Sequence, residues 1–391
     1  MDPMRARDHI RLAYVIDGLD PSGGAEQSLA AVAPHYVERD IDLTVISLKD
    51  RDGLHDRIEK AGGRTIALGC AGTRPTKVRH LIPLFKQLRP DIVHTTLFEA
   101  DIAGRIAGAA VHLPVVSSLV NDAYGSGHLG DPGISTARLR AAQCVDALTA
   151  RFVRRFHAIT TYVARAMSSR LRIPLQRIDV VPRGRDSATL GDRTPSRRRE
   201  ARTSLGISEE PLILVAARHE RQKGIDVLLD AVPIIREAIP NVRVVIAGRV
   251  GNGTAQLERQ VAQLDLSSTV TFLGRRQDVA DLLCGADVLV MPSRWEGLGG
   301  VLLEAMCLQT PIVASDLPSI REALKDGETA ILVQPEDEVA LAQGLVNVLT
   351  DGDAASRRAR VARQRFADRF DMSGVADQMR AFYDRALAGT R

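Results

Sequence analysis

The sequence alternates short apolar runs with segments of helical periodicity, and it does so in two separate series. The runs are rich in Val, Ile and Leu, and turn-forming residues bound them. In the first half they lie at 12–16, 43–48, 91–96, 114–119 and 179–183. In the second half they lie at 212–217, 242–248, 270–274, 287–292, 311–315 and 330–334. Strands that alternate with helices predict a parallel, doubly wound sheet, so the two series predict two α/β domains.

The stretch between the two series sets the predicted domain boundaries. Residues 183–199 are polar, basic and free of apolar periodicity, which favours a linker. We therefore expect domains at 1–185 and 186–365, with a cleft between them. The length of 391 residues agrees, because ordinary domains hold about 100 to 200 residues. Residues 366–391 predict a closing helix that packs back on the first domain, with an apolar side of Phe366, Phe370, Val375, Met379 and Tyr383.

Cysteine spacing, hydropathy and charge disfavour several classes of protein. Cys70, Cys144, Cys284 and Cys307 are too far apart for a zinc site or a redox dithiol, which suits a reducing cytosol. No export-signal pattern and no run of about 18 apolar residues is present, so we expect a cytoplasmic protein that does not span a membrane. The 52 basic and 48 acidic residues nearly balance, and the basic residues are not interleaved with aromatics, so we expect no nucleic-acid partner.

The segment MPSRWEGLGGVLLEAM at 291–306 is the most informative part of the sequence. A predicted strand ends at Met291, a glycine-rich loop follows and a helix begins near Val301, so free backbone N–H groups point at the loop. Such a helix start binds phosphate readily. Glu296 precedes the turn and Glu304 lies one turn into the helix, where a carboxylate can accept two hydrogen bonds from sugar hydroxyls. Alternatively, Glu296 caps the helix and Glu304 is a solvated helix position.

Two cations follow the first strand of the second series. Arg218 and Lys223 lie in AARHERQKGIDVLLDA, after the strand and before a helix. Ligands of parallel sheets bind at the carboxyl ends of the strands, so these cations are suited to bind an anion opposite the Glu296 loop. Basic residues in loops are more often simply solvated, but the position of these two in the same sheet favours the anion site.

The first domain has a glycine turn of its own. The strand at 12–16 leads to DGLDPSGGAEQSLAAV, where Gly23 and Gly24 precede a helix that carries Glu26. Glycines allow a ligand to approach the backbone closely, and the helix start favours negative charge. The turn matches neither the dinucleotide fingerprint nor the Walker P-loop, so the sequence supports neither a nicotinamide enzyme nor an NTPase.

Together, GGAE at 23–26, R-x4-K at 218–223 and E-x7-E at 296–304 make the chain resemble the retaining GT-B glycosyltransferases of family 4. The resemblance spans nearly the whole chain. It implies two doubly wound Rossmann-like domains that face each other across a cleft, an acceptor-side domain at 1–185 and a nucleotide-sugar-binding domain at 186–365. It also implies transfer of a sugar from a UDP- or GDP-linked donor to a hydroxyl acceptor, with retention of the anomeric configuration.

The resemblance assigns donor-side roles to the motif residues. Arg218 and Lys223 would hold the diphosphate, Glu296 the transferred sugar, and Glu304 the ribose hydroxyls. The other donor contacts that it implies are Gly297, Leu298, Gly299 and Gly300 in the second domain and Gly23 and Gly24 in the first.

The reaction fits these positions without a metal. Breaking the bond between the anomeric carbon and the phosphate builds negative charge on the diphosphate, which fixed cations and helix N–H groups stabilise as it forms. We therefore interpret Arg218, Lys223 and Glu296 as the catalytic residues, and we expect no metal and no cofactor besides the nucleotide sugar. The Asp-x-Asp pair Asp40 and Asp42 precedes a first-domain strand outside the predicted site, so we interpret it as surface charge.

The acceptor side departs from the family pattern. Where many relatives carry a His after the fifth strand, this chain has Val120, followed by Asn121 and Asp122. Asp122 is a candidate for binding an acceptor hydroxyl, although a loop Asp is more often a turn former. Glu26 and His94 are further acceptor-side candidates. For His94, which lies on the strand at 91–96, core packing and acceptor contact are both open.

Two other loops also differ from the family pattern. The usual Asn-Gly after VVP is Arg183-Gly184 here, and the usual Gly before TP is Gln309. Neither position touches the expected donor contacts, so the differences indicate a divergent branch of the family.

A basic stretch in the first domain bears on the acceptor. Together with VRHLIPLFKQLR at 78–89, it could form a cationic apolar surface that meets anionic lipid. Such a surface would suit a lipid-linked or cell-envelope glycan acceptor and peripheral contact with the inner face of the membrane. Solvated helix faces are the more ordinary explanation, and an acceptor in solution stays open. The arginines of this stretch are Arg138, Arg140, Arg151, Arg154, Arg155, Arg165, Arg170 and Arg172.

Two other functions fit the same fold. A catalytically silent nucleotide-sugar-binding partner protein would keep Arg218, Lys223 and Glu304 but lose Glu296 or the glycine loop, and both are intact here. A nucleotide-sugar epimerase would need acid and base groups around the sugar instead of an open acceptor cleft. An epimerase would also form a new sugar from the donor alone, which an assay without acceptor tests.

Overall fold

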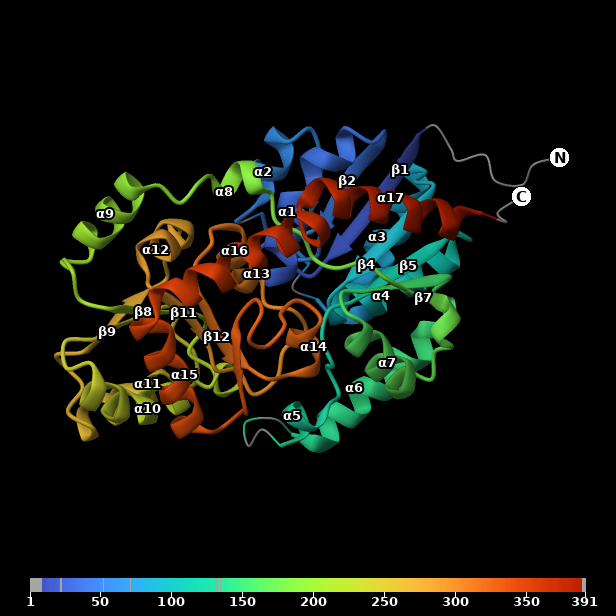
Figure 1. Cartoon of the computed structure of the whole chain (residues 1–391). Coiled ribbons are helices and arrows are strands. Elements are labelled where there is room, and N and C mark those ends of the chain that lie inside the picture. Colours follow the sequence, from blue (N-terminus) through green and yellow to red (C-terminus); the bar gives the residue numbers. More distant parts are fainter. Residues whose placement is uncertain are drawn as a thin grey trace. The chain divides into compact units, whose positions relative to one another are not determined.

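The computed structural model describes residues 9–388, apart from 22, 52, 71, 131, 132 and 134. The chain divides into two compact units: a first unit of Met1–Gly184 with Asp371–Arg391, and a second unit of Arg185–Phe370. Each unit is built on one parallel sheet covered by helices (Figure 1), which confirms the predicted fold class of two doubly wound α/β sheets.

The first unit contains a seven-stranded sheet in the order β3-β2-β1-β4-β5-β6-β7. Its strands are β1 Ile10–Ile16, β2 Ile41–Ser47, β3 Arg64–Ala67, β4 Ile92–Thr96, β5 Val115–Leu119, β6 Arg155–Ala158 and β7 Ile178–Val180. Its helices are α1 Gly24–Val37, α2 His55–Lys60, α3 Arg74–Leu88, α4 Phe98–Ala110, α5 Ser126–Leu129, α6 Thr136–Thr149, α7 Thr161–Leu171 and α17 Met372–Leu387. The five strands predicted in this half are confirmed. The sequence does not predict β3 or β6, because RTIA and RFHA are short and each contains a basic residue.

The second unit contains a six-stranded sheet in the order β10-β9-β8-β11-β12-β13, and all six strands are predicted by the sequence. They are β8 Leu212–Ala216, β9 Arg243–Ala247, β10 Val270–Gly274, β11 Val288–Met291, β12 Ile312–Ser315 and β13 Ile331–Val333. The helices are α8 Ser187–Leu190, α9 Pro195–Ser204, α10 Ile225–Ala238, α11 Thr254–Gln263, α12 Val279–Gly285, α13 Gly300–Cys307, α14 Pro318–Arg321, α15 Glu338–Thr350 and α16 Gly352–Arg369.

The polar stretch 183–199 differs from the linker that the sequence predicts. It contains α8 and the first half of α9, and both helices belong to the second unit. Helix α9 docks through arginines: Arg197 Nε lies 2.6 Å from Asp281 Oδ1, and the buried Arg202 lies 3.2 Å from Asp287 Oδ2. A helix that packs through guanidinium groups shows no apolar periodicity, which is why the pattern indicated a linker.

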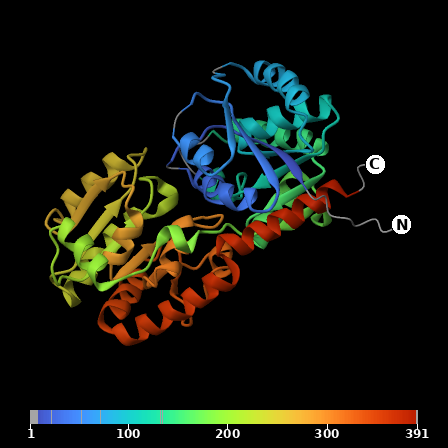
Figure 2. The same ribbon diagram turned by 90° about the horizontal axis from the view of Figure 1, so that it is seen from above.

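The C-terminal segment forms two helices in place of the single predicted one. Phe366 lies in α16, which ends at Arg369, and α17 begins at Met372. Between them Asp371 caps α17, because its side chain accepts a hydrogen bond from the Ser373 N–H at 3.2 Å. Helix α17 belongs to the first unit, where it lies along the sheet in Figure 2, and its Met379 and Tyr383 side chains are buried in that unit's core.

The strand order of each sheet reverses once. In the first sheet β2 and β3 lie on one side of β1, and β4 to β7 lie on the other. In the second sheet β9 and β10 lie on one side of β8, and β11 to β13 lie on the other. Ligands of doubly wound sheets bind outside the carboxyl ends of the strands at such a reversal. The loops after β1 and β4 and those after β8 and β11 are therefore the places to look for a site.

One ion cluster lies deep inside the first unit. Arg105 on α4 is fully buried, and its Nη1 lies 2.5 Å from Asp146 Oδ1 on α6. Its Nε donates to Ser117 Oγ at 2.9 Å, and its Nη2 lies 3.5 Å from Asp101 Oδ2. Burial raises the pKa of Asp101 to about 7, although Arg105 opposes the shift. The cluster links two helices to β5 through charges that water does not reach.

Candidate active site

Two loops of the second unit are held together at the carboxyl ends of β8 and β11. Gln222, in a 3-10 turn after β8, donates from Nε2 to the Trp295 carbonyl at 2.8 Å, and the Arg294 N–H donates to the Gln222 carbonyl at 2.8 Å. Gly224 ends this turn with φ of +62°, and a Cβ there would lie 1.9 Å from the Pro292 carbonyl oxygen. A side chain is excluded on both counts, so glycine is required for this close approach.

Lys223 and Glu296 form an ion pair between these two loops. Lys223 Nζ contacts Glu296 Oε1, which also accepts a hydrogen bond from Ser293 Oγ at 3.0 Å. The two side chains are only 17% and 7% exposed. The structure thus brings together two of the three residues that the sequence predicts as catalytic, at the reversal point of the sheet. Ser293 and Gln222, which fix the pair and its loops, are not singled out by any sequence pattern.

Arg218 also follows β8 but has a different partner. Its Nη1 lies 2.7 Å from Glu220 Oε1, and its side chain is 39% exposed. An anion that binds Arg218 would therefore compete with a carboxylate two residues away. The predicted role of Arg218 in holding a diphosphate stays a prediction.

The glycine loop leads directly into α13. Gly299 is the N-cap with extended backbone, φ −67° and ψ 123°, and as a glycine it offers no side chain to the first N–H groups of the helix. Gly297 and Leu298 are buried, with the Leu298 side chain 2% exposed, so Leu298 can offer a ligand only its backbone. A helix start without a side-chain cap carries N–H groups and a partial positive charge that suit a phosphate.

Glu304 lies one turn into α13 and is paired with a residue that the sequence patterns do not single out. Arg185 Nε lies 2.7 Å from Glu304 Oε1, with side chains 10% and 19% exposed. The Arg185 guanidinium reaches back over the helix start, since a Cβ at Gly300 would lie 1.9 Å from Arg185 Nη2. The pair joins residues 119 positions apart in the sequence. The predicted boundary had placed Arg185 in the other domain.

In the first unit, charged side chains fill the space beside the two predicted glycines. A Cβ at Gly23 would lie 2.0 Å from Glu26 Oε2, and a Cβ at Gly24 would lie 2.9 Å from Arg183 Nη1. Burial raises the pKa of Glu26, and the charge of Arg183 acts in the opposite direction. Both glycines precede or begin α1, as predicted, but in this structure they make room for a carboxylate and a guanidinium.

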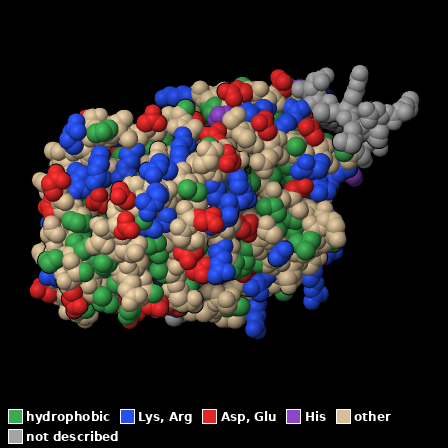
Figure 3. Space-filling model, viewed as in Figure 1, with side chains coloured by type: hydrophobic (Ala, Val, Ile, Leu, Met, Phe, Trp, Pro, Cys, Tyr) green, Lys and Arg blue, Asp and Glu red, His purple; other side chains and the backbone are tan. Residues whose placement is uncertain are grey.

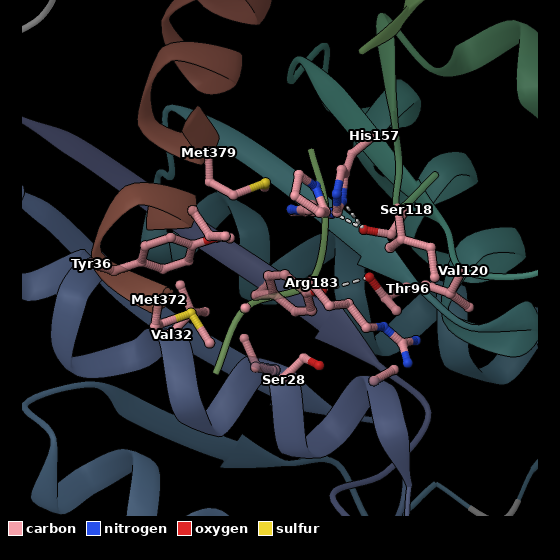
Figure 4. A pocket seen from close by; sticks show the side chains of 18 residues that line it. Ser28, Val32, Tyr36, Thr96, Ser118, Val120, His157, Arg183, Met372 and Met379 are labelled. Atoms are coloured by element: carbon pink, nitrogen blue, oxygen red, sulfur yellow. Dashed lines mark hydrogen bonds between the residues drawn. The ribbon is translucent and has the colours of Figure 1, made fainter. Parts of the chain in front are cut away.

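Below this turn the first unit contains a mainly apolar cavity of about 60 Å³. Figure 4 shows Met372 and Met379 of α17 on one wall and Ser118 and His157 of the sheet on another, with the Arg183 side chain extending across. His94 also lines it, but His94 is 1% exposed and its two ring nitrogens bind Tyr383 and Ser118. The observed contacts of His94 are those of a core residue.

His94 and His157 belong to one chain of hydrogen bonds, and the donor and acceptor of each bond follow from its end at a backbone carbonyl. His157 Nε2 must donate to the Val181 carbonyl at 2.8 Å, so in a neutral ring His157 Nδ1 accepts from Ser118 Oγ at 2.9 Å. Ser118 Oγ then accepts from His94 Nε2 at 2.7 Å, and His94 Nδ1 accepts from the Tyr383 hydroxyl at 2.8 Å. Burial lowers the pKa of His94 well below its ordinary value and that of His157 to about 4, so both rings stay neutral.

These two histidines predict a loss of stability in mild acid. Because each pKa is lower in the folded state, the unfolded state takes up protons first as the pH falls below about 6.5, and stability drops. Between about pH 7.5 and 5.5 the pair should lower the unfolding free energy by about 2 to 3 kcal/mol. His157→Gln should remove about half of this pH dependence in denaturant titrations. An unchanged pH slope in that variant would contradict the derived protonation states.

The other acceptor-side candidates lie after β5. Asp122 forms an ion pair with Arg170, with Oδ1 2.9 Å from Nε, and accepts a hydrogen bond from the Tyr162 hydroxyl at 3.4 Å. Asn121 beside it is half-buried. Asp122 thus has two partners within the first unit, and its predicted acceptor contact stays a prediction.

The acidic residues bear on metal binding. Within the described ranges, no group of three or more His, Cys, Asp and Glu side chains is close enough together to hold a metal ion. Asp42 of the Asp-x-Asp pair lies at the amino end of β2, where it pairs with Arg64 of β3 at 3.1 Å. That end of the sheet is opposite to the loops after β1 and β4.

The second unit therefore presents, around one reversal point, a carboxylate–lysine pair, an uncapped helix start and a carboxylate–arginine pair. Carboxylates accept hydrogen bonds from hydroxyls, and the helix start and the cations attract phosphate. A ligand that combines sugar hydroxyls with a phosphate fits this set of groups.

Comparisons with known proteins agree with this chemistry. A family model described as "Glycosyl transferases group 1" matches residues 197–365, and one described as "Glycosyl transferase 4-like domain" matches residues 23–184. A glycogen synthase of Mycobacterium tuberculosis is 30% identical over 331 residues, which are 84% of this chain and 76% of that protein. A phosphatidyl-myo-inositol mannosyltransferase of Mycobacterium leprae is 39% identical over 176 residues, 44% of this chain and 46% of that protein.

Solved structures show the same fold. The crystal structure of Anabaena HepE in complex with UDP-glucose superposes with a TM-score of 0.84 and covers 96% of this chain and 100% of its own. Its sequence identity to this chain is 22%, so the similarity concerns the arrangement of the elements.

Proposed function

Since the chain belongs to the group 1 glycosyltransferases of family 4, with their GT-B fold and hexosyltransferase activity, we propose that it moves a hexose from a UDP- or GDP-linked donor to a hydroxyl acceptor, with retention of the anomeric configuration. The observation that carries the proposal is the half-buried Lys223–Glu296 pair beside the start of α13, which has no side-chain cap. In this assignment Glu296 binds hydroxyls of the transferred sugar, Lys223 binds the diphosphate and Glu304 binds the ribose.

Lys223 is suited to act on the leaving group. As the bond between the anomeric carbon and the phosphate breaks, negative charge grows on the diphosphate, and a fixed ammonium group close to it lowers the barrier. The ion pair with Glu296 and the hydrogen bond of Ser293 to that carboxylate hold both charges in place before the donor arrives. The helix start of α13 adds backbone N–H groups at the same edge of the sheet. Retention itself is inferred from membership of the family.

Binding of the nucleotide should raise thermal stability without a metal. A ligand at about 100 times its dissociation constant adds about 2.7 kcal/mol to the unfolding free energy of the unit that binds it, which corresponds to a shift of several degrees. We expect this shift with UDP or GDP and with the matching sugar nucleotide, unchanged by EDTA. ADP serves as the control nucleotide. A shift that EDTA abolishes would contradict the metal-free site, and no shift with UDP or GDP would contradict the proposed function.

The acceptor that we propose is lipid-linked, with a cytoplasmic enzyme in peripheral contact with the inner face of the membrane. One matched relative is named for phosphatidyl-myo-inositol, which supports a lipid acceptor. No helix in the described part of the chain is long and apolar enough to cross a bilayer. Of the arginines predicted to meet lipid, Arg155 pairs with Asp179, Arg170 with Asp122, and Arg154 donates to the Ala388 carbonyl. In the segment 78–89, Leu81 and Phe85 are buried in the core.

The remaining candidate surface is smaller than the predicted one. It consists of exposed apolar and basic residues at the end of α6 and in the turns before β6 and β7: Leu148, Arg151, Phe152, Arg172 and Leu175. Arg177 ties the two turns together by donating to the Val153 carbonyl. Basic side chains project from the region of α6 in Figure 3, while acidic and basic residues are interspersed over the rest of that face. Apolar side chains beside arginines suit an anionic bilayer.

Vesicle binding tests this surface. Vesicles of phosphatidylcholine with phosphatidylserine should bind the protein, and phosphatidylcholine alone should bind it at least about tenfold more weakly, since each arginine near an anionic surface contributes about 1 kcal/mol. Phe152→Ser combined with Leu175→Ser should reduce binding by about tenfold or more, because their burial in the bilayer is lost. Val361→Ser, an equally exposed position in the second unit, is the control. Equal binding to both vesicles would contradict the proposed membrane contact.

A further inference from the structure

Arg185 and Glu304 form a largely buried ion pair inside the site assigned to the donor. The Arg185 residue is 8% exposed, and its Nε donates to Glu304 Oε1 at 2.7 Å. The Arg185 backbone N–H donates to the Phe370 carbonyl at 2.9 Å, so its main chain is fixed as well. Arg185 is therefore anchored at both ends.

The position of this arginine is unusual for a cation. Its guanidinium lies over the first residue of α13, where the partial positive charge of a helix start disfavours cations. Two features make the position possible. Gly300 has no side chain, and a Cβ there would lie 1.9 Å from Nη2. Glu304, one turn further along the helix, supplies the compensating charge.

The pair also leaves Glu304 able to bind a ligand. A carboxylate has about four acceptor sites, and one bond from Arg185 occupies one of them. The bond from Nε restrains the position of the Glu304 carboxylate. A carboxylate held in this way is ready to accept hydrogen bonds from two neighbouring hydroxyls.

We infer that Arg185 is a positioning residue: it orients Glu304 toward the ribose hydroxyls of the nucleotide donor. The inference rests on the proposed function, in which Glu304 binds the ribose. It assigns to Arg185 part of the enzyme's ability to distinguish a ribonucleotide from its 2′-deoxy analogue.

The test compares the dissociation constants of UDP and 2′-deoxy-UDP by calorimetry, with GDP and 2′-deoxy-GDP measured in parallel. For the wild-type protein we expect the deoxy analogue to bind about tenfold more weakly or worse, since a hydrogen bond to a charged group is lost. In Arg185→Met, the ratio of the dissociation constant of the 2′-deoxy nucleotide to that of the ribonucleotide should fall below about threefold. Glu304→Ala should lower this ratio to the same extent. In a Glu304→Ala background, Arg185→Met should change the ratio no further, as expected for two residues that act as one unit.

Two further variants separate positioning from folding and from charge. Gly300→Ala keeps the arginine but displaces its guanidinium, so it should lower the ratio in the same direction. Arg185→Lys should retain part of the ratio, because a shorter cation can still reach a carboxylate. Gly352→Ala is the matched control, since a Cβ at that glycine meets nothing within 4 Å. Thermal unfolding of each variant checks that the second unit is folded.

Three outcomes overturn the inference in different ways. If Arg185→Met weakens both ligands equally and leaves the ratio intact, Arg185 contacts the phosphates and does not position Glu304. If Glu304→Ala leaves the ratio intact, the ribose is bound elsewhere. If the wild-type protein binds neither UDP nor GDP, the proposed function itself fails and the inference fails with it.

Discussion

Lys223→Ala is expected to lower the rate of sugar transfer by about 100-fold. Removing one fixed group that stabilises developing charge typically costs about 100- to 1,000-fold in rate, and Lys223 is the cation that the structure pairs with Glu296. The effect should be largest on kcat, because the charge on the diphosphate is greatest in the transition state. Where no acceptor is known, slow hydrolysis of the nucleotide sugar by water serves as the measured reaction.

Glu296→Gln is the companion variant. It keeps the shape of the side chain but removes the charge that holds Lys223, so we expect a loss of at least about tenfold. Lys325→Ala provides the control: Lys325 is also a lysine of the second unit paired with a glutamate, but it is 55% exposed. Rates near wild type for both Lys223→Ala and Glu296→Gln would rule out this site. Trp295, the single tryptophan, lies in the same loop as Glu296, and its fluorescence reports whether the second unit is folded.

Arg105→Leu is expected to cost about 3 to 5 kcal/mol of unfolding free energy in the first unit. Removing the buried guanidinium leaves the Asp146 carboxylate without its compensating charge, and that cost exceeds the value of an exposed pair several-fold. Arg64→Leu is the control, since Arg64 is 63% exposed in its pair with Asp42 and should change stability by less than about 1 kcal/mol.

The measurement can assign this loss to one unit. Trp295 lies in the second unit, so its fluorescence follows that unit alone, whereas far-UV circular dichroism follows both. Arg105→Leu should move the dichroism transition to lower urea and leave the fluorescence transition in place. If replacing Arg105 costs no more than replacing Arg64, the buried cluster does not stabilise the first unit.

The sheets could be predicted from sequence to the extent that their strands are apolar. The six strands of the second sheet consist mainly of apolar residues, with Val, Ile and Leu the most frequent, and pattern analysis detects such runs. β6 carries Arg155 and His157 in four residues, and these side chains are satisfied by Asp179 and by the hydrogen-bond chain. The partners of these two polar side chains are distant in sequence, so no local pattern predicts that a strand can contain them. The same holds for α9, which docks through arginines.

The donor-side residues could be predicted only in part, because some of their partners are distant in sequence. The loops that carry Lys223 and Glu296 follow predicted strands, and the topology of a parallel sheet brings them to one edge. The partner of Glu304 could not be found in this way, since Arg185 follows Gly184 in a polar stretch with no periodicity. A signal was present in hindsight: the arginines at 183 and 185 flank a glycine, and each fills the space beside a glycine of its own unit, Gly24 or Gly300.

The membership of α17 in the first unit has a consequence for biosynthesis. The first unit is assembled from both ends of the chain, whereas the second is contiguous, Arg185–Phe370. On the ribosome, the whole second unit is therefore synthesised before Met379, Phe382 and Tyr383 can cover the Tyr36 side of the first core. Until Met372–Leu387 has been synthesised, that apolar surface has no covering helix, and nascent chains that stop near residue 370 are the ones that chaperones should hold longest.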